Sequence, residues 1–98
     1  MKEIVLENDK LSELCVDFKA LSDEGRLKII LYLLGGKQSV NAISEKVGLS
    51  QSATSHQLRI LKDARILRCE RVGNVSYYYL SDEHVKTLIL TAVEHLGC

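Results

Sequence analysis

Five helical patterns and one pair of β-rich runs predict a mainly α-helical domain with a β-hairpin wing, the α+β class called winged helix-turn-helix. Three observations favour this class. Two short amphipathic helices are separated only by Gly48, Leu49 and Ser50. A hairpin pattern centred on Gly73 and Asn74 follows them, and one more amphipathic helix ends the sequence. We therefore expect five helices and one hairpin.

Length and composition agree with one domain. The 98 residues are 46% hydrophobic and 27% charged, which is typical of a soluble globular protein. We expect residues 1–8 to form a flexible tail and residues 9–98 to form a single domain. Within it lie the helix-turn-helix at 39–64, the wing at 66–80 and the last helix at 82–96. A domain of this size buries only about 60–65% of its unfolded surface, so a partner subunit would add to its core.

The first half of the chain is predicted to hold two helices. The first spans residues 9–20, and we expect its residue Cys15 to lie in the core. Its apolar side chains recur at helical spacing, at Leu11, Leu14, Cys15, Phe18 and Leu21. The second helix opens at Ser22 or Asp23, both good N-caps, and ends at the Gly35-Gly36 pair.

The second half contains the motif, the hairpin and the last helix. Ser39 starts the first motif helix, and Ser50 caps the second, which runs to about Ala64. The runs RILRCERV and VSYYYLS flank a Gly-Asn pair suited to positive φ, so they predict the hairpin. Ser81 and Asp82 offer caps for the last helix. Its apolar stripe comprises Val85, Leu88, Ile89, Ala92, Val93 and Leu96.

Positive charge is concentrated in one part of the chain, although the 13 basic and 13 acidic residues cancel. Residues 50–80 hold five basic and two acidic side chains. This segment contains the second motif helix and the wing. A zero net charge argues against a wholly basic nucleic-acid coat, so any contact with nucleic acid is expected to come from this segment.

Several classes of protein are excluded by what the sequence lacks. No apolar run approaches the roughly 18 residues of a membrane helix, and the first residues lack a secretory pattern, so we expect a cytoplasmic protein. Cys15, Cys69 and Cys98 are too scattered for a disulfide framework and are interpreted as reduced thiols. The sequence shows no nucleophile–base pair and no phosphate-binding glycine loop, so we do not expect this protein to be an enzyme.

The second motif helix predicts a surface that reads DNA. On a helical wheel Thr54, Leu58 and Leu61 cluster on one face, which we expect to pack on the domain. The other faces carry small polar and basic side chains that can bond base edges and phosphates in a major groove. We predict that this helix and the wing contact double-stranded DNA through Gln51, Ser52, Ser55, His56, Arg59, Arg68, Arg71 and Asn74.

Four residues of metal-ligand type lie near the C-terminal end, at Asp82, His84, His95 and Cys98. His84 and His95 share one helix face, but the helical rise separates them by about 16 Å, so one helix cannot place both on one ion. If two copies pack antiparallel through this helix, Asp82 and His84 of one meet His95 and Cys98 of the other. This ligand set suits tetrahedral Zn(II), with Cd(II) or Co(II) as alternatives, and a closed site leaves no position for hydrolysis.

Four stretches resemble the ArsR/SmtB family of bacterial winged-helix, metal-sensing transcriptional repressors. They are FKALSDEGRLKIILYL, AISEKVGLSQSATSHQLRILKDARIL, RVGNVSYYYL and the final D-x-H-x(10)-H-x-x-C pattern. The resemblance implies a homodimer through the first and last helices. It also implies that the dimer binds operator DNA when metal-free and dissociates when Zn(II) or a similar ion occupies an inter-subunit site formed by the final pattern.

Three features of the sequence differ from the usual family pattern. Cys98 stands where the family has His or Glu, which leaves the metal preference and the fourth ligand open between the thiol and the terminal carboxylate. Glu24-Gly25 replaces a Pro-Thr type pair. The run ELCVD at 13–17 is similar to a soft-metal cysteine motif, but it lies on the first helix and not in the helix before the recognition helix.

Two other functions fit the same fold. A thiol- or redox-sensing repressor would use Cys15, Cys69 and Cys98 instead of metal. A winged helix used only for protein interaction would show no operator affinity and no steep loss of binding with salt.

Overall fold

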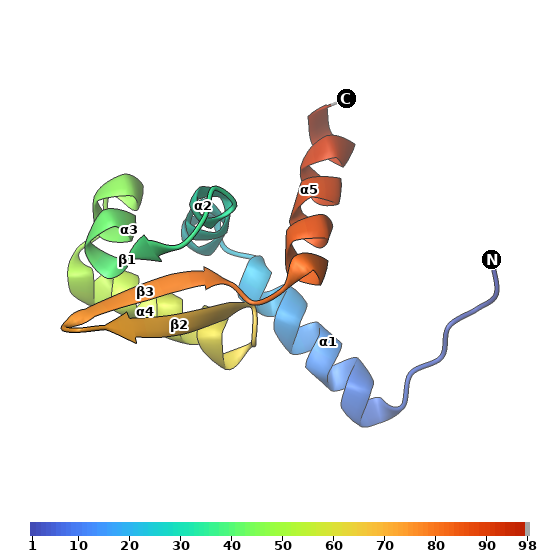
Figure 1. The fold of residues 1–98 in the computed structure, drawn as a ribbon. Helices are drawn as coiled ribbons and strands as arrows, with labels where there is room; N and C mark the ends of the chain where they lie inside the picture. Colours follow the sequence, from blue (N-terminus) through green and yellow to red (C-terminus); the bar gives the residue numbers. More distant parts are fainter. Residues whose placement is uncertain (98) are drawn as a thin grey trace.

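The computed structural model describes residues 1–97, which contain five helices and a three-stranded antiparallel sheet. In chain order the elements are α1 (Asn8–Leu21), α2 (Glu24–Leu33), β1 (Gln38–Ser39), α3 (Val40–Val47), α4 (Gln51–Asp63), β2 (Leu67–Val72), β3 (Val75–Leu80) and α5 (Glu83–Gly97). Figure 1 shows the β2–β3 hairpin alongside α4, with α3 near one end of the molecule and α1 and α5 projecting from the other. The predicted winged helix-turn-helix class is confirmed.

Side-chain caps begin the four helices after α1, at residues that the sequence pattern indicates. Asp23, Ser39, Ser50 and Asp82 each accept a hydrogen bond from the backbone N–H three residues later, at 3.0, 3.1, 3.1 and 3.0 Å. Each cap satisfies one N–H that the first helical turn leaves without a partner. The predicted helix starts therefore have a local physical cause.

The turn between α3 and α4 is stabilised by Ser44 and Gly48. Gly48 adopts φ 72°, a left-handed conformation that glycine tolerates without a Cβ penalty. The buried Ser44 hydroxyl donates to the Leu49 carbonyl at 2.7 Å and accepts from the Thr54 hydroxyl at 3.2 Å. These bonds connect both helices of the motif to the loop between them, so α4 leaves the turn in a defined direction.

The core fills the space between α2, α3, α4 and the hairpin. Its fully buried side chains include Ile29 and Ile30 of α2 and Ile43 of α3. On α4, Thr54, Leu58 and Leu61 each have 0% exposure, so the predicted inner face is confirmed. This burial leaves the remaining sides of α4 to face outward.

The hairpin agrees with its prediction, but the sheet has a strand that we did not predict. β2 and β3 pair antiparallel from Leu67 with Leu80 to Val72 with Val75. Of the two turn residues, Gly73 and Asn74, only Gly73 has a positive φ, at 61°. This is the pattern of a type II′ turn. β1 pairs Gln38 and Ser39 with β3. Two residues are too few for an alternating pattern to reveal a strand.

The expectation that Cys15 lies in the core is wrong. Cys15 is exposed, and so are Leu14 and Phe18 on the same helix, at 42% and 51%. The apolar spacing of α1 is real, but only its C-terminal end packs on the domain, where Ala20 is 5% exposed. Most of the apolar face of α1 is therefore not covered by its own chain.

Arg26 connects α1, α2 and α4. Its Nε donates to the carbonyl of Ala20 at 2.6 Å, and one terminal nitrogen donates to Oε1 of Gln57 on α4 at 3.0 Å. Gln57 in turn donates to the Asp23 carboxylate at 3.3 Å. A Cβ at Gly25 would lie 3.2 and 3.3 Å from the Asp23 and Gln57 side chains, so glycine at this position leaves room for the network.

We expect Arg26→Met to lower the free energy of unfolding by about 2–3 kcal/mol, because hydrogen bonds from a charged donor are lost and partly buried acceptors lose their partners. Urea denaturation at one fixed protein concentration measures this. Lys28→Met on the exposed side of the same helix is the matched control and should change the value by less than about 0.5 kcal/mol. Equal losses in both variants would contradict the role of the network.

Candidate functional site

The outer side of α4 presents the residues predicted to read DNA. Ser52, Ser55, His56 and Arg59 are all exposed and lie away from the buried face of the helix. Gln51, the first residue of α4, is exposed as well, and its side chain donates a hydrogen bond to Asn41 of α3. The structure thus brings these five predicted residues together on one helix.

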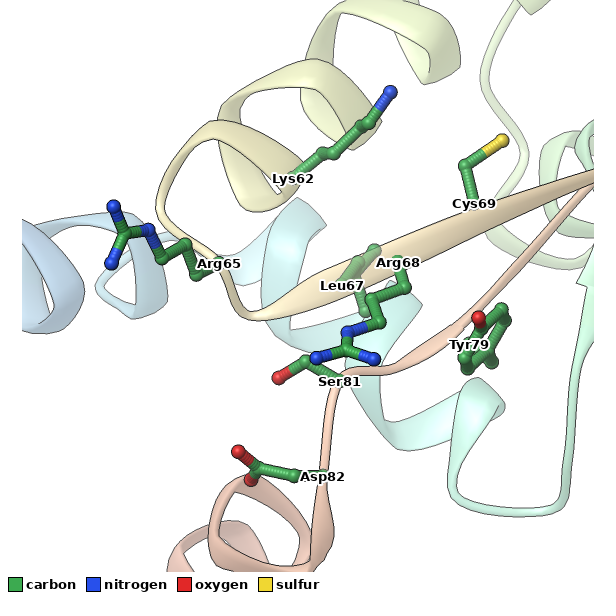
Figure 2. A pocket seen from close by; sticks show the side chains of 8 residues that line it. All are labelled: Lys62, Arg65, Leu67, Arg68, Cys69, Tyr79, Ser81 and Asp82. Carbon is green, nitrogen blue, oxygen red and sulfur yellow. The ribbon is translucent and has the colours of Figure 1, made fainter.

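The three wing residues predicted to contact DNA lie at two different places on the hairpin. Asn74 is exposed at the turn, and Arg71 Nε donates to the Gly73 carbonyl at 3.2 Å, so both lie at the tip. Arg68 pairs with Tyr79 near the base of the hairpin. Figure 2 shows its guanidinium pointing toward Ser81, away from the tip. A DNA contact by Arg68 stays a prediction that needs the wing base to approach the duplex.

Near Arg68 lie two further basic residues that were not among the predicted DNA contacts. Lys62 and Arg65 line a cavity of about 470 Å³ at the base of the wing together with Arg68 and Asp82 (Figure 2). Arg65 has φ 62°, a left-handed conformation that costs a non-glycine residue about 1–2 kcal/mol. It ends α4, where the N–H of Ile66 donates to the Leu61 carbonyl at 2.9 Å. Only the local charge excess of the segment signalled these residues.

Tyr78 of β3 lies close enough to α4 to interact with the charge of Arg59. Burial raises the pKa of Tyr78, and the neighbouring Cys69 thiol, which shares a hydrogen bond with it, raises this pKa further. The positive charge of Arg59 acts in the opposite direction. Tyr78 therefore keeps its hydroxyl proton at neutral pH, and its β2 partner Cys69 is half-buried.

Three of the four predicted metal ligands belong to the described residues, and they lie near the two ends of α5. Asp82 Oδ1 is 3.7 Å from His84 Nδ1, and their side chains are 53% and 98% exposed. The backbone N–H of Val85 and the nearby His84 lower the pKa of Asp82, so it is a carboxylate at neutral pH. His95 is exposed in the last turns of α5. Cys98 lies outside the described residues.

One copy of the chain does not gather a metal site from its described residues. Among residues 1–97, no three His, Cys, Asp or Glu side chains come together around one point. His84 and His95 are eleven positions apart in the chain, which places them about 16 Å apart along α5. The donor types are ones that bind divalent ions, but their separation along α5 prevents His84 and His95 of one copy from binding the same ion.

Apolar side chains are exposed next to these ligands. Leu14 and Leu21 of α1 and Leu88 of α5 line a groove of about 480 Å³ that also includes Asp82 and His84. Farther along the two helices, apolar residues with at least 45% exposure are Leu11, Val16, Phe18, Val93 and Leu96. Exposed apolar surface of this extent is typical of a protein–protein contact.

Comparison with known proteins assigns the family. A family model described as bacterial regulatory protein, arsR family, matches residues 23–68. A transcriptional repressor SmtB homolog from Synechocystis is 36% identical over 94% of this chain and 70% of its own length. The chain belongs to the arsR family of bacterial regulatory proteins. The family resemblance noted in the sequence is confirmed.

Other relatives and solved structures agree with this assignment. A cadmium resistance regulatory protein CadC homolog from Staphylococcus aureus is 42% identical over 80% of this ArsR-family chain and 65% of its own length. A homodimeric winged helix-turn-helix DNA-binding domain from Mycobacterium bovis matches with TM-score 0.86 and 28% identity, over 99% of this chain and 94% of that one. NolR from Sinorhizobium fredii matches with TM-score 0.85 and 27% identity, over 100% and 99%.

Membership in the family defines the general activity. The ArsR-family chain is a winged-helix DNA-binding transcriptional repressor and not an enzyme, as the sequence analysis expected. Within residues 1–97 no helix is long and apolar enough to cross a membrane. The exposed side of α4 and the tip of the wing are the surfaces through which such a fold approaches DNA.

We expect Arg71→Ala to weaken binding to specific and non-specific DNA alike and to reduce the slope of log affinity against log salt concentration by about 1, because a phosphate contact is lost. Fluorescence anisotropy at several salt concentrations measures both effects. Lys28→Ala, at an exposed lysine of α2, is the control and should keep the wild-type slope. An unchanged slope for Arg71→Ala would mean that the wing tip does not touch the backbone.

Proposed function

We propose that this protein is a metal-responsive repressor that binds operator DNA as a homodimer when metal-free and dissociates when Zn(II) or a similar divalent ion binds. The observation that carries the proposal is the placement of Asp82, His84 and His95. All three are exposed at or near the ends of α5, Asp82 and His84 line an apolar groove, and the spacing of the two histidines fits a metal site only between two copies. Such a site would join the sensing function to the dimer that binds DNA.

The dimer is supported by the surface of α1 and α5. Leu14, Phe18, Leu88 and Val93 expose 42–51% of their surface, although each belongs to the apolar pattern of its helix. Packing these faces against a second copy would remove apolar surface from water at about 25 cal/mol per Å². A symmetric dimer also presents two copies of α4, the helix predicted to read DNA and here called the recognition helix, and two such helices bind half-sites about one helical turn of DNA apart.

The ligand chemistry supports a borderline divalent ion. Asp82 supplies a carboxylate and His84 and His95 supply imidazoles, the donors that Zn(II) uses in four-coordinate protein sites. When bound, the ion would add a rigid connection between the α5 helices of two protomers. Cys98 would complete the site if its thiol binds, which favours Zn(II), Cd(II) or Co(II) over harder ions.

The response to metal is a coupling between two sites. If metal lowers DNA affinity, DNA must lower metal affinity by the same factor, and typical couplings are about 1–3 kcal/mol. The residues that transmit it are those of α5 and the elements that α5 contacts, β3 among them. A change in the relative angle of two protomers would move both recognition helices away from successive major grooves.

The function itself is tested by fluorescence anisotropy of the reduced protein on the DNA upstream of its own gene. We expect tight binding in chelator and release by stoichiometric Zn(II). DNA binding that is unaffected by Zn(II), Cd(II) and Co(II) would contradict metal sensing. If the variant with serine at Cys15, Cys69 and Cys98 then lost an oxidant response, the thiol-sensing alternative would replace it.

Mixed dimers test whether the metal site spans two protomers. We expect His84→Gln and His95→Gln each to abolish Zn(II)-dependent release of DNA as homodimers, while metal-free affinity is retained. A heterodimer of the two variants should recover one intact site, because His84 of one protomer meets His95 of the other. Competition for Zn(II) with a chromophoric chelator counts the sites.

The matched control for the mixed dimers is Glu83→Gln, which removes an exposed neighbouring carboxylate of α5. It should keep two sites per dimer. A heterodimer with no recovered site would show that the ligands do not combine across the dimer as proposed.

A further inference from the structure

The pocket at the base of the wing is lined by three basic side chains that lack partners. Lys62 belongs to α4, Arg65 to the turn after it and Arg68 to β2, and all three line the cavity of about 470 Å³ shown in Figure 2. Within residues 1–97 none of the three side chains makes a hydrogen bond or an ion pair. Pockets lined by charges of one sign attract counter-ions, so this one favours an anion.

The carboxylate of Asp82, which also lines the pocket, is directed elsewhere. Its Oδ1 accepts a hydrogen bond from the backbone N–H of Val85 at 3.0 Å and lies 3.7 Å from Nδ1 of His84. The groups that lower the pKa of Asp82 are likewise Val85 and His84. The negative charge of Asp82 is therefore used at the start of α5, and the pocket keeps an excess of positive charge.

The hydroxyl of Ser81 is a second and independent observation. It is buried and has no hydrogen-bond partner among the residues that the structure describes. The backbone N–H of Ser81 donates to the Ile66 carbonyl at 3.0 Å, which fixes Ser81 beside the turn that carries Arg65. Figure 2 shows the guanidinium of Arg68 pointing toward Ser81. Because buried hydroxyls are generally hydrogen-bonded, this one next to a guanidinium indicates a place for an acceptor oxygen.

A tetrahedral oxyanion would satisfy these groups together. Its oxygens accept hydrogen bonds from the planar fork of a guanidinium and from a hydroxyl, the two groups that Arg68 and Ser81 supply. Lys62 and Arg65 are exposed at the edge of the pocket, so their long side chains can rotate toward the same anion. A doubly charged anion balances three cations better than chloride or a carboxylate does.

We propose that this pocket binds a phosphate-type oxyanion, held by Arg68 and Ser81 and neutralised further by Lys62 and Arg65. The anion connects α4, β2 and the segment before α5, so it ties the base of the wing to the recognition helix. The same phosphate group is available from free inorganic phosphate and from the DNA backbone. This site goes beyond the proposed function and does not depend on metal binding.

The test titrates inorganic phosphate into the reduced, metal-free protein and follows binding by isothermal titration calorimetry. Chloride keeps the ionic strength constant, which removes the effect of screening. We expect one saturable site per protomer. Arg68→Gln and Ser81→Ala should each weaken phosphate binding about 10-fold or more, because each removes a hydrogen bond to a charged group. Ser81→Ala should remain folded, since the hydroxyl makes no bond within residues 1–97.

Matched controls remove the same chemical groups elsewhere on the wing. Arg71→Gln removes a guanidinium of the same strand near the tip, and Ser76→Ala removes a hydroxyl of β3. Both variants should keep the wild-type affinity for phosphate. Thermal unfolding verifies that every variant is folded.

A second titration, with protein bound to DNA, separates the two sources of phosphate. If phosphate binds the complex as tightly as the free protein and Ser81→Ala leaves DNA affinity unchanged, the site takes a free oxyanion. If DNA prevents phosphate binding and Ser81→Ala weakens DNA binding, the site takes a phosphate of the DNA backbone. Both results support the proposal. A protein that fails to bind DNA would reject the proposed operator binding, and the first titration would still decide the anion site.

Three results would overturn the inference. The first is the absence of saturable binding at millimolar phosphate. The second is binding that Arg68→Gln and Ser81→Ala leave unchanged, which would place the anion elsewhere. The third is an equal loss in Arg71→Gln, which would mean that phosphate associates with basic surface in general.

Discussion

The guanidinium of Arg26 is the interaction on which the arrangement of the helices depends. It donates to the carbonyls of Ala20 and Lys19 at the end of α1, where the helix dipole is negative, and to Gln57 in the middle of α4. One side chain therefore connects the projecting helix to the recognition helix. Because α1 exposes most of its apolar face, a partner that packed on this face would contact a helix that Arg26 bonds to α4.

The second constraint is the small size of the domain. Its core lies between α2, α3, α4 and the hairpin, which leaves α1 and α5 with apolar faces that their own chain does not cover. The residues of metal-ligand type lie along the same exposed α5, too far apart for one ion. A second copy would cover the apolar faces and bring these ligands together, so stability and sensing would share one interface.

Much of the fold was predictable because its signals are local. Asp23, Ser39, Ser50 and Asp82 cap helices through bonds that span three residues, and the inner face of α4 follows from helical spacing. The features that were not predicted correctly have no local signal in the sequence. The β1 strand forms only because β3 lies beside it, the left-handed Arg65 replaces the usual glycine, and Cys15 follows an apolar pattern that its own chain leaves exposed.

The sequence by itself determined the winged helix-turn-helix class, the family and the residue types offered to DNA and metal, because periodicity, caps and spacing act over a few residues. Tertiary structure alone decided which of these residues work together. It joined Asn41 to Gln51 across the motif, placed Arg68 at the base of the wing and Arg71 at its tip, and separated the α5 ligands within one copy. These relations depend on how helices and strands pack against each other, which residue spacing along the chain does not encode.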